Sequence, residues 1–433
     1  AAERLGEAES ATRDRHAAYT FGLWRAREAA LKGAGQLDAL RELSAERDNL
    51  RAAWAWALQT GQLDVSDAAW PALWAFYEMR GGFAEGGALF EQAVQAARDG
   101  PSPLRLGRAL TYLGWFQMRL GRFAQAHALF DEALARLRPA GDPAAESSAA
   151  LFMGILKYVS GEWQAAWEWL TEARALAERL GDRWLAAQAL INQQGAAGAL
   201  TGRWSEAYAG MQAALDAMQA LGDVRTRVTA LNFYVAPLAM ALGDYAGLRR
   251  PLEEALAFFE QAGDAWGLAL TYANLGRVAQ AQGDFAEARR LLERGLALHA
   301  ELGARADVAF SRLRLGQLEA AAGEGDQAEV HLRAALRLGM EVNALPTALE
   351  AAGALAQLWA GRDGAAGRAL ELGLRVMRHP ACPAELRAAL EPLCRDLADR
   401  LGPEQAETVQ AHASAEDFAS AVRRLSGDAL RTE

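Results

Sequence analysis

Two short signals return through this chain of 433 residues at intervals of about 40, and they limit what it can fold into. The first is a glycine followed two residues later by an aromatic residue and five residues later by a small one. Its copies are Gly81/Phe83/Gly86, Gly121/Phe123/Ala126, Gly161/Trp163/Ala166, Gly202/Trp204/Ala207, Gly243/Tyr245 and Gly283/Phe285/Ala288, with weaker copies at Gly323/Ala328 and Gly361/Ala366. The second is a glycine-aspartate pair between these copies, at Gly141-Asp142, Gly181-Asp182, Gly222-Asp223 and Gly263-Asp264. A fixed period of this length predicts a fold built by stacking one unit repeatedly.

Residues 264–303 show what one unit contains. Asp264 is placed to cap a first helix, and Gly283 supplies the left-handed residue that ends it. A second helix is expected from Phe285 to Leu302, and Gly276 is small where the two helices cross. The unit is therefore a helical hairpin, and neither helix can bury its apolar face without neighbouring copies.

Composition and spacing together predict an all-α fold. The chain is 52% apolar with 12 prolines, β-branched residues are sparse, and apolar residues recur with a helical period. A period near 40 also fits HEAT or armadillo units. The order of Tyr272, Leu275, Gly276, Gly283, Phe285, Ala288 and Leu292 instead resembles the tetratricopeptide repeat, with units about six residues longer than usual. This resemblance implies a right-handed superhelical solenoid of about eight long hairpins over residues 64–378. About eight hairpins are expected to complete one superhelical turn.

Two segments flank the predicted solenoid. Residues 1–63 are expected to form an N-terminal helical hairpin, and residues 379–433 a helical cap whose last helix starts after Ser414-Ala415-Glu416-Asp417. The run Arg15-His16-Ala17-Ala18-Tyr19 and the stretch from Leu43 to Leu58 are similar to the segment that joins a winged helix to the repeats in signal-transduction ATPases of the STAND class and in MalT- or AfsR-like bacterial transcriptional regulators. The resemblance implies that residues 1–63 are a junction to an upstream module whose sensor is the repeat array.

The ATPase expected of such a family is not encoded in this sequence. Neither of the two lysines, Lys32 and Lys157, follows a glycine, so no phosphate-binding loop of the Gly-x-x-x-x-Gly-Lys type exists. The resemblance implies that the ATPase and the winged helix lie upstream in a longer parent protein. The chain begins with Ala1, so we expect either a removed initiator or a fragment.

Charge and motifs argue against catalysis, metal binding and nucleic-acid binding. The net charge is −10, with acids and arginines interleaved, which is typical of a solvated outer surface. His-Glu-x-x-His, Gly-x-Ser-x-Gly, Cys-x-x-Cys and acidic calcium-loop motifs are all missing from the sequence. We therefore expect a chain that is not an enzyme and uses no cofactor or metal. With two cysteines and no secretory or transmembrane segment in the sequence, we expect a cytoplasmic location without membrane contact.

The first helix of each hairpin is expected to line a concave inner wall. Counting from the small residue of each first helix places ten candidate ligand-binding residues on that wall: Arg108, Thr111, Trp115, Met118, Tyr158, Asn192, Phe233, Met240, Arg277 and Gln280. Packing against neighbouring side chains is the alternative role for each of them. Together they form a mostly apolar wall with few polar groups, which suits a small hydrophobic effector or an apolar peptide segment.

Two functions fit these features. In the first, the chain is the non-catalytic sensor of a signal-transduction ATPase or transcription regulator and binds an effector or peptide in its lumen. In the second, it is a free-standing tetratricopeptide scaffold for protein-protein interaction. The junction-like residues 13–58 favour the first.

Overall fold

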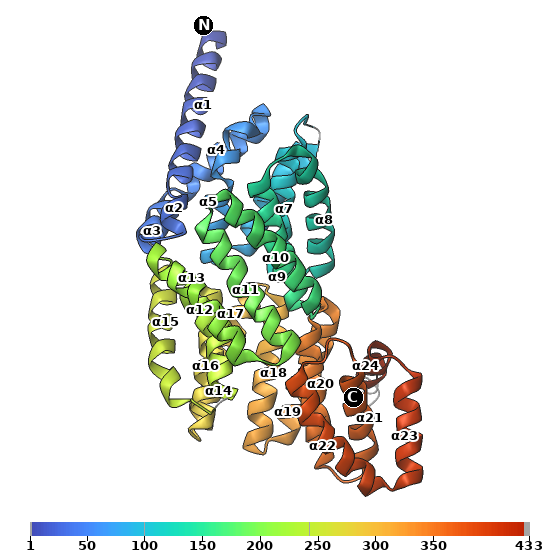
Figure 1. Ribbon diagram of the computed structural model, residues 1–433. Helices are drawn as coiled ribbons and strands as arrows, with labels where there is room; N and C mark the ends of the chain where they lie inside the picture. Colours follow the sequence, from blue (N-terminus) through green and yellow to red (C-terminus); the bar gives the residue numbers. More distant parts are fainter. Residues whose placement is uncertain (1, 99, 242, 428–433) are drawn as a thin grey trace.

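The computed structural model describes residues 2–98, 100–241 and 243–427, and over these residues the chain forms helices and no β-strand (Figure 1). In chain order the elements are α1 (Ala2–Ala26), α2 (Glu28–Leu31), α3 (Gln36–Ala45), α4 (Arg47–Thr60), η1 (Leu63–Val65), η2 (Asp67–Ala69), α5 (Trp70–Met79), α6 (Phe83–Arg98), α7 (Pro103–Arg119), α8 (Phe123–Ala140), α9 (Pro143–Val159), α10 (Trp163–Leu180), α11 (Arg183–Thr201), α12 (Trp204–Leu221), α13 (Val224–Ala230), η3 (Leu231–Val235), α14 (Ala236–Ala241), η4 (Ala246–Leu248), α15 (Arg249–Ala262), α16 (Ala265–Ala281), α17 (Phe285–Glu301), α18 (Arg305–Ala322), α19 (Gly325–Val342), α20 (Leu345–Ala360), α21 (Ala366–Arg378), α22 (Ala384–Leu401), α23 (Pro403–Ala415) and α24 (Phe418–Gly427). Three of the η elements are 3-10 turns, and η3 is a π-helical turn. Residues 428–433 of the predicted cap lie outside the described residues.

The repeated signals mark the helix ends as predicted. The turn glycines from Gly81 to Gly323 have positive φ, and Gly361 is the exception because Gly364 takes the left-handed conformation in its place. Each aspartate of the second signal caps a helix. The carboxylates of Asp142, Asp182, Asp223 and Asp264 accept hydrogen bonds from the backbone N–H three residues on, at 2.9–3.1 Å.

Small residues allow the two helices of a hairpin to cross closely, as expected. A Cβ atom at Gly276 would lie 3.0 Å from Cγ of Leu292, and one at Gly114 would lie 2.6 Å from the Phe130 ring. The large partner therefore fills the space that the glycine leaves, which is how ridges and grooves are matched between packed helices.

Successive turns of the superhelix lie directly against each other, and in Figure 1 α3 lies above α13 and α15. Three hydrogen bonds between turns are Gln36 Nε2 to Asp223 Oδ1 at 2.8 Å, Arg80 Nη1 to the Ala262 carbonyl at 2.8 Å, and Trp204 Nε1 to Glu385 Oε1 at 2.5 Å. The paired residues are 187, 182 and 181 positions apart, so one turn takes between four and five hairpins. The prediction of about eight hairpins per turn is wrong because neighbouring hairpins rotate more strongly than it assumed.

A buried ion network joins the first turn to the second. Glu78 on α5 pairs with Arg225 at 3.1 Å and with Arg119 at 3.3 Å, and Arg225 also pairs with Asp264 at 2.9 Å. The carboxylates of Glu78 and Asp264 are 6% and 0% exposed. Burial raises the pKa of Glu78, but the charges of Arg119 and Arg225 outweigh it and the pKa is lowered overall. Burial prevails in Asp264, whose pKa is raised.

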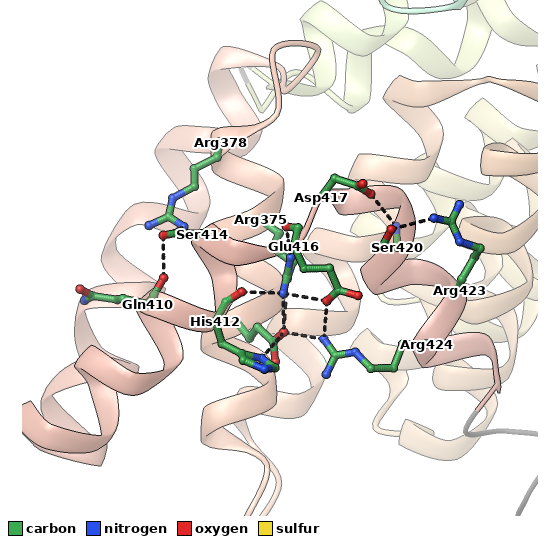
Figure 2. Close-up of polar contacts among 11 residues, drawn as sticks. Arg375, Arg378, Gln410, His412, Ser414, Glu416, Asp417, Ser420, Arg423 and Arg424 are labelled. Atoms are coloured by element: carbon green, nitrogen blue, oxygen red, sulfur yellow. Dashed lines mark hydrogen bonds and ion pairs between the residues drawn. The ribbon is translucent and has the colours of Figure 1, made fainter.

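The C-terminal helices are held by a second buried arginine. Arg375 on α21 is 2% exposed and pairs with Glu371 at 2.8 Å and with Glu416 at 3.0 Å, while it also donates to the carbonyl of His412 at 2.9 Å (Figure 2). Arg424 of α24 pairs with the same two carboxylates. Since Arg375 and Glu371 lie on α21, His412 on α23 and Arg424 on α24, this network fastens the last two helices to the array.

The predicted start of the last helix is confirmed in part. The Asp417 carboxylate accepts from the backbone N–H of Ser420 at 2.7 Å and caps α24, whereas Ser414 instead accepts a hydrogen bond from Arg378 at 2.8 Å. The division of the chain at residues 63/64 and 378/379 stays a prediction.

We expect Glu78→Gln to lower the free energy of unfolding by about 3–5 kcal/mol, because Arg119 then loses its carboxylate and Arg225 keeps only one. Urea unfolding followed by circular dichroism measures the loss. The matched control is Glu254→Gln, whose exposed pair with Arg250 contributes at most about 1 kcal/mol. Equal effects of the two substitutions would show that the buried network does not hold the turns together.

Candidate ligand-binding surface

Aromatic side chains fill the interior of the first superhelical turn. The Trp74 ring centroid lies 5.7 Å from that of Trp115, 5.2 Å from that of Phe152 and 6.3 Å from that of Trp184. Trp74 is on α5 and Trp184 is on α11, so these contacts reach across the turn and not only between neighbouring hairpins. The Trp115 indole also donates to Glu78 at 2.7 Å. The first turn therefore has a packed interior.

Half of the ten predicted wall residues belong to packed or paired positions. Thr111, Trp115, Met118 and Met240 are buried, with exposed fractions of 2, 8, 6 and 3%. Arg108 is half-buried and its guanidinium binds the cap carboxylate of Asp142. These five residues are packed or paired within the structure and do not face an open lumen. Trp115 and Met118 belong to the core of the first turn, and Met240 packs in a separate cluster with Leu252 and Tyr272.

The other five predicted residues are Tyr158, Asn192, Phe233, Arg277 and Gln280, and all are half-buried. Three of them meet at the irregular fifth hairpin. There η3 makes a π-helical turn that ends two residues before Pro237, whose ring nitrogen has no N–H to donate to the regular helix. The turn carries Tyr234, which donates to the Asn192 side chain at 3.1 Å and lies 6.1 Å from the Tyr158 ring. Phe233 stacks on Trp266 at 5.5 Å.

A second group of polar residues continues this surface onto the second turn. Arg314 on α18 pairs with Glu350 on α20 at 3.5 Å and donates to Gln317 at 2.8 Å. The negative charge of Glu350 acts on both Tyr158 and Arg277. We call the whole set the inner polar surface, and its members are Tyr158, Asn192, Tyr234, Arg277, Arg314 and Glu350.

On the inner polar surface, the pKa values of Tyr158 and Arg277 are shifted from the ordinary values of these side chains. Burial raises the pKa of Tyr158, and the charges of Glu350 and Glu385 raise it further. Burial lowers the pKa of Arg277 to about 10, the neighbouring Arg314 lowers it as well, and Glu350 compensates only in part. Strongly perturbed groups of this kind concentrate at functional sites. The surface offers hydroxyl and amide groups for hydrogen bonds and a guanidinium for an anion.

Counting from the small residue of each first helix did not identify Tyr234, Arg314 and Glu350 as candidate ligand-binding residues. A signal for two of them was present, because Tyr234 and Arg314 occupy the position two residues before the small residue, where earlier hairpins carry Tyr112 and Phe152. Pro237 indicated that the helix is irregular there, so residue positions counted along a regular helix would be wrong. Glu350 had no comparable signal.

The described residues also form a cavity away from the inner polar surface, but they contain no metal site and no helix that could span a membrane. A cavity of about 470 Å³ lies at the contact between turns, lined by Gly35, Gln36, Leu37, Asp38, Arg41, Gly222, Val224, Phe258 and Gln261, so it does not coincide with the inner polar surface. In residues 2–98, 100–241 and 243–427, no three side chains of histidine, cysteine or acids are grouped to hold a metal ion. Across the same residues, every helix is too short or too polar to span a membrane.

Truncation of Trp115 separates packing from ligand contact. We expect Trp115→Ala to lower the free energy of unfolding by about 3–5 kcal/mol, because it removes a large side chain from a packed interior and leaves a cavity. Chemical denaturation measures the change. The control is Val330→Ala, because Val330 is 58% exposed and little buried area is lost. If both variants kept wild-type stability, Trp115 would belong to a ligand-facing surface after all.

Comparison with known proteins supports the repeat architecture. The family model described as tetratricopeptide repeat matches residues 226–301, which include η3 and the hairpin of α16 and α17. No curated protein matches the sequence.

Solved structures extend the likeness to nearly the whole chain. A chain of the APC/C hetero-tetramer Cut9-Hcn1 matches 87% of this chain with a TM-score of 0.54 and 15% identity, and this chain covers 62% of its length, which is less than two thirds. The Rap conjugation gene regulator of the plasmid pLS20, solved in complex with the Phr* peptide, matches 89% of this chain and 99% of its own, with a TM-score of 0.54 and 15% identity. A STAND protein with a tetratricopeptide repeat sensor from Pyrococcus horikoshii matches 93% of this chain and 54% of its own at a TM-score of 0.37 and 11% identity, too distant to carry an argument. The chain is an all-helical superhelical solenoid that contains tetratricopeptide repeats.

Proposed function

We propose that this chain is a non-catalytic sensor that binds a short peptide or small effector on the inner polar surface. The observation that carries the proposal is the contact of Tyr158, Asn192 and Tyr234 at the π turn. Because π turns are rare and are frequently found at functional sites, a polar surface built around one is a candidate for binding. Half-buried hydroxyl and amide groups beside aromatic rings are what a ligand site needs for both affinity and orientation.

The arrangement of this surface explains how binding is sensed. Tyr158 and Asn192 belong to α9 and α11, whereas Arg277, Arg314 and Glu350 belong to α16, α18 and α20. A ligand that contacts both groups favours one separation of the superhelical turns over others. A ligand shifts a conformational equilibrium only by its difference in affinity for the two states, and a surface shared between turns supplies that difference.

The Rap regulator with its Phr* peptide supports a peptide as the ligand, since its fold matches this chain over nearly its full length. The effect of binding is transmitted, in this proposal, to an upstream ATPase and winged-helix module of a STAND-class or MalT- or AfsR-like regulator. That part rests on the resemblance of residues 13–58. It is supported by the exposed Tyr19 on α1, with 69% of its surface accessible, and by the N-terminal end of α1, which projects beyond α4 in Figure 1.

A scaffold for a protein partner is the second candidate. The likeness to a chain of the Cut9-Hcn1 hetero-tetramer favours it, because that assembly is built from several protein chains. The two candidates differ in the size of what is bound, so one measurement separates them.

Native mass spectrometry of the purified chain, followed by denaturing extraction, tests the proposal. We expect a bound molecule of small-molecule or short-peptide mass to be released on denaturation. Its affinity, measured by calorimetry, should fall at least about tenfold in Tyr158→Ala, which corresponds to about 1.4 kcal/mol. Asn192→Ala should weaken binding in the same direction, because it removes both the Asn192 amide and the acceptor that orients Tyr234.

Tyr19→Ala is the matched control, since it removes the same side chain from an exposed position on α1. It should leave the affinity unchanged. Equal loss in Tyr19→Ala and Tyr158→Ala would contradict a site on the inner polar surface. Recovery of a folded protein partner in place of a small ligand would favour the scaffold.

A further inference from the structure

The first and second superhelical turns touch through their backbones where the loop after α2 meets the end of α12. The Ala34 N–H donates to the Leu221 carbonyl at 3.0 Å. A Cβ atom at Gly33 would lie 2.7 Å from the Leu221 oxygen, and one at Gly222 would lie 2.8 Å from the Ala34 nitrogen. Only glycine fits at both positions, so this glycine contact sets the distance between the turns along one edge.

Gln36 fixes the start of α3 against the same edge. Its side chain is 4% exposed, and its amide nitrogen donates to the Leu31 carbonyl at 3.0 Å and to Asp223 Oδ1 at 2.8 Å. Its amide oxygen accepts from the backbone N–H of Arg225 at 3.1 Å. Since a buried amide with partners on both its nitrogen and its oxygen has one orientation, α3 is held in a fixed position at the start of α13.

The cavity of about 470 Å³ lies directly beside the glycine contact, because Gly35, Gln36 and Gly222 are part of its lining. The rest of the lining comes from α3, α13 and α15. Its volume is within the range of about 300–1,000 Å³ that is usual for small-molecule sites. Because the glycine contact and Gln36 fix the separation of the turns, the cavity is a lasting feature of the contact between them.

The lining combines apolar side chains that meet water with polar groups that carry no net charge. Leu37 and Phe258 are half-buried, and Val224 is 37% exposed. Among the described residues of the lining, Asp38 is the acid and Arg41 is the base, and the two side chains pair with each other. A charged ligand would lose its hydration here without finding a free opposite charge, whereas an apolar ligand removes apolar surface from water on both sides.

We propose that this cavity is a second ligand site, which takes a neutral, largely apolar molecule with one hydrogen-bonding group. Leu37, Val224 and Phe258 supply the apolar contact, and the exposed Gln261 amide supplies a hydrogen bond. A molecule that fills the cavity contacts α3 of the first turn and α15 of the second at once, so it binds the stacked arrangement of the turns and stabilises it. The site is separate from the inner polar surface and does not depend on the proposed function.

N-phenyl-1-naphthylamine is a suitable probe, because it is neutral and largely apolar, has one N–H donor and fluoresces more strongly when it leaves water. Its 8-sulfonate keeps the same rings and adds a negative charge, which makes it the matched control ligand. We expect the neutral probe to bind the whole chain, and the sulfonate to bind at least about tenfold more weakly, because the lining does not replace the hydration that the anion loses. Equal affinity of the two probes would overturn the assignment of a neutral ligand.

Filling the cavity tests its position. Val224→Trp and Gln261→Trp place a large ring in the cavity from α13 and from α15, and both positions are exposed, so we expect the fold to be kept. Each variant should weaken binding of the neutral probe at least about tenfold. Val330→Trp is the matched control, because it makes the same change at a side chain on α19 that is 58% exposed, and it should leave the affinity unchanged. Probe binding that survives both filling variants, that Val330→Trp also removes, or that is missing from the wild-type chain would overturn the site.

Hydrogen exchange of the Ala34 amide measures the link between the site and the stacking of the turns, since this N–H donates across the glycine contact. If opening of the stacked turns destroys the site, the neutral probe at about ten times its dissociation constant should slow this exchange about tenfold. Exchange that is unchanged with the probe bound would contradict the stabilisation of the stacked turns.

The inference and the sensor function fail separately. Tyr158→Ala should keep the affinity for the neutral probe, because Tyr158 is not part of the lining of the cavity. Binding that is kept in Tyr158→Ala and lost in Val224→Trp assigns the probe to the cavity, whatever ligand the inner polar surface binds. Binding that is lost in Tyr158→Ala and kept in Val224→Trp would place the probe on the inner polar surface and overturn the cavity site.

Discussion

The close stacking of superhelical turns is the constraint on which the rest of this structure depends, and two of the cap aspartates contribute to it. Asp264 accepts from the backbone of Gly267 to start α16 and also pairs with Arg225, which reaches Glu78 on the first turn. Asp223 caps α13 and accepts from Gln36, which lies 187 residues earlier. The same carboxylates therefore begin helices locally and set the separation of turns. In a simple solenoid each unit contacts only its neighbours. Here contacts between turns add coupling over more than 180 residues of sequence.

The interiors of the two turns carry different side chains. A narrow turn leaves little room on its axis, so large residues at inner positions must pack against one another. In the first turn these residues are Trp74, Trp115 and Phe152, and the axis is filled. In the second turn the corresponding region carries Asn274, Arg277 and Arg314. Asn274 donates hydrogen bonds to Asn232, and Arg314 donates to Gln317 and pairs with Glu350, so polar contacts replace aromatic packing in this region.

The sequence was sufficient to predict the helical hairpins, but it was not sufficient to predict how many hairpins make one superhelical turn. Helix ends depend on residues that act locally, such as Gly283 with its positive φ and Asp264 with its cap, and these were predicted correctly. The number of hairpins per turn depends on small rotations that accumulate between units, and those rotations follow from side-chain volumes at each interface. The assumed pitch also entered the choice of candidate site residues. Trp115 was placed on an open wall because an open lumen was assumed, whereas Tyr158 and Arg277 lie where the lining is only half-buried.

The π turn shows why the remaining site residues could not be obtained by counting. A helical count assumes a constant rotation per residue, and η3 departs from it just before Pro237. The departure brings Tyr234 to Asn192 and lets Phe233 stack on Trp266. Trp266 is itself covered by Arg119, 4.0 Å from its ring, and Arg119 pairs with Glu78. A continuous path of contacts thus links the π turn to the ion network between the turns. In the proposed function, a ligand that contacts Tyr234 therefore acts on the same set of contacts that fixes the superhelical pitch.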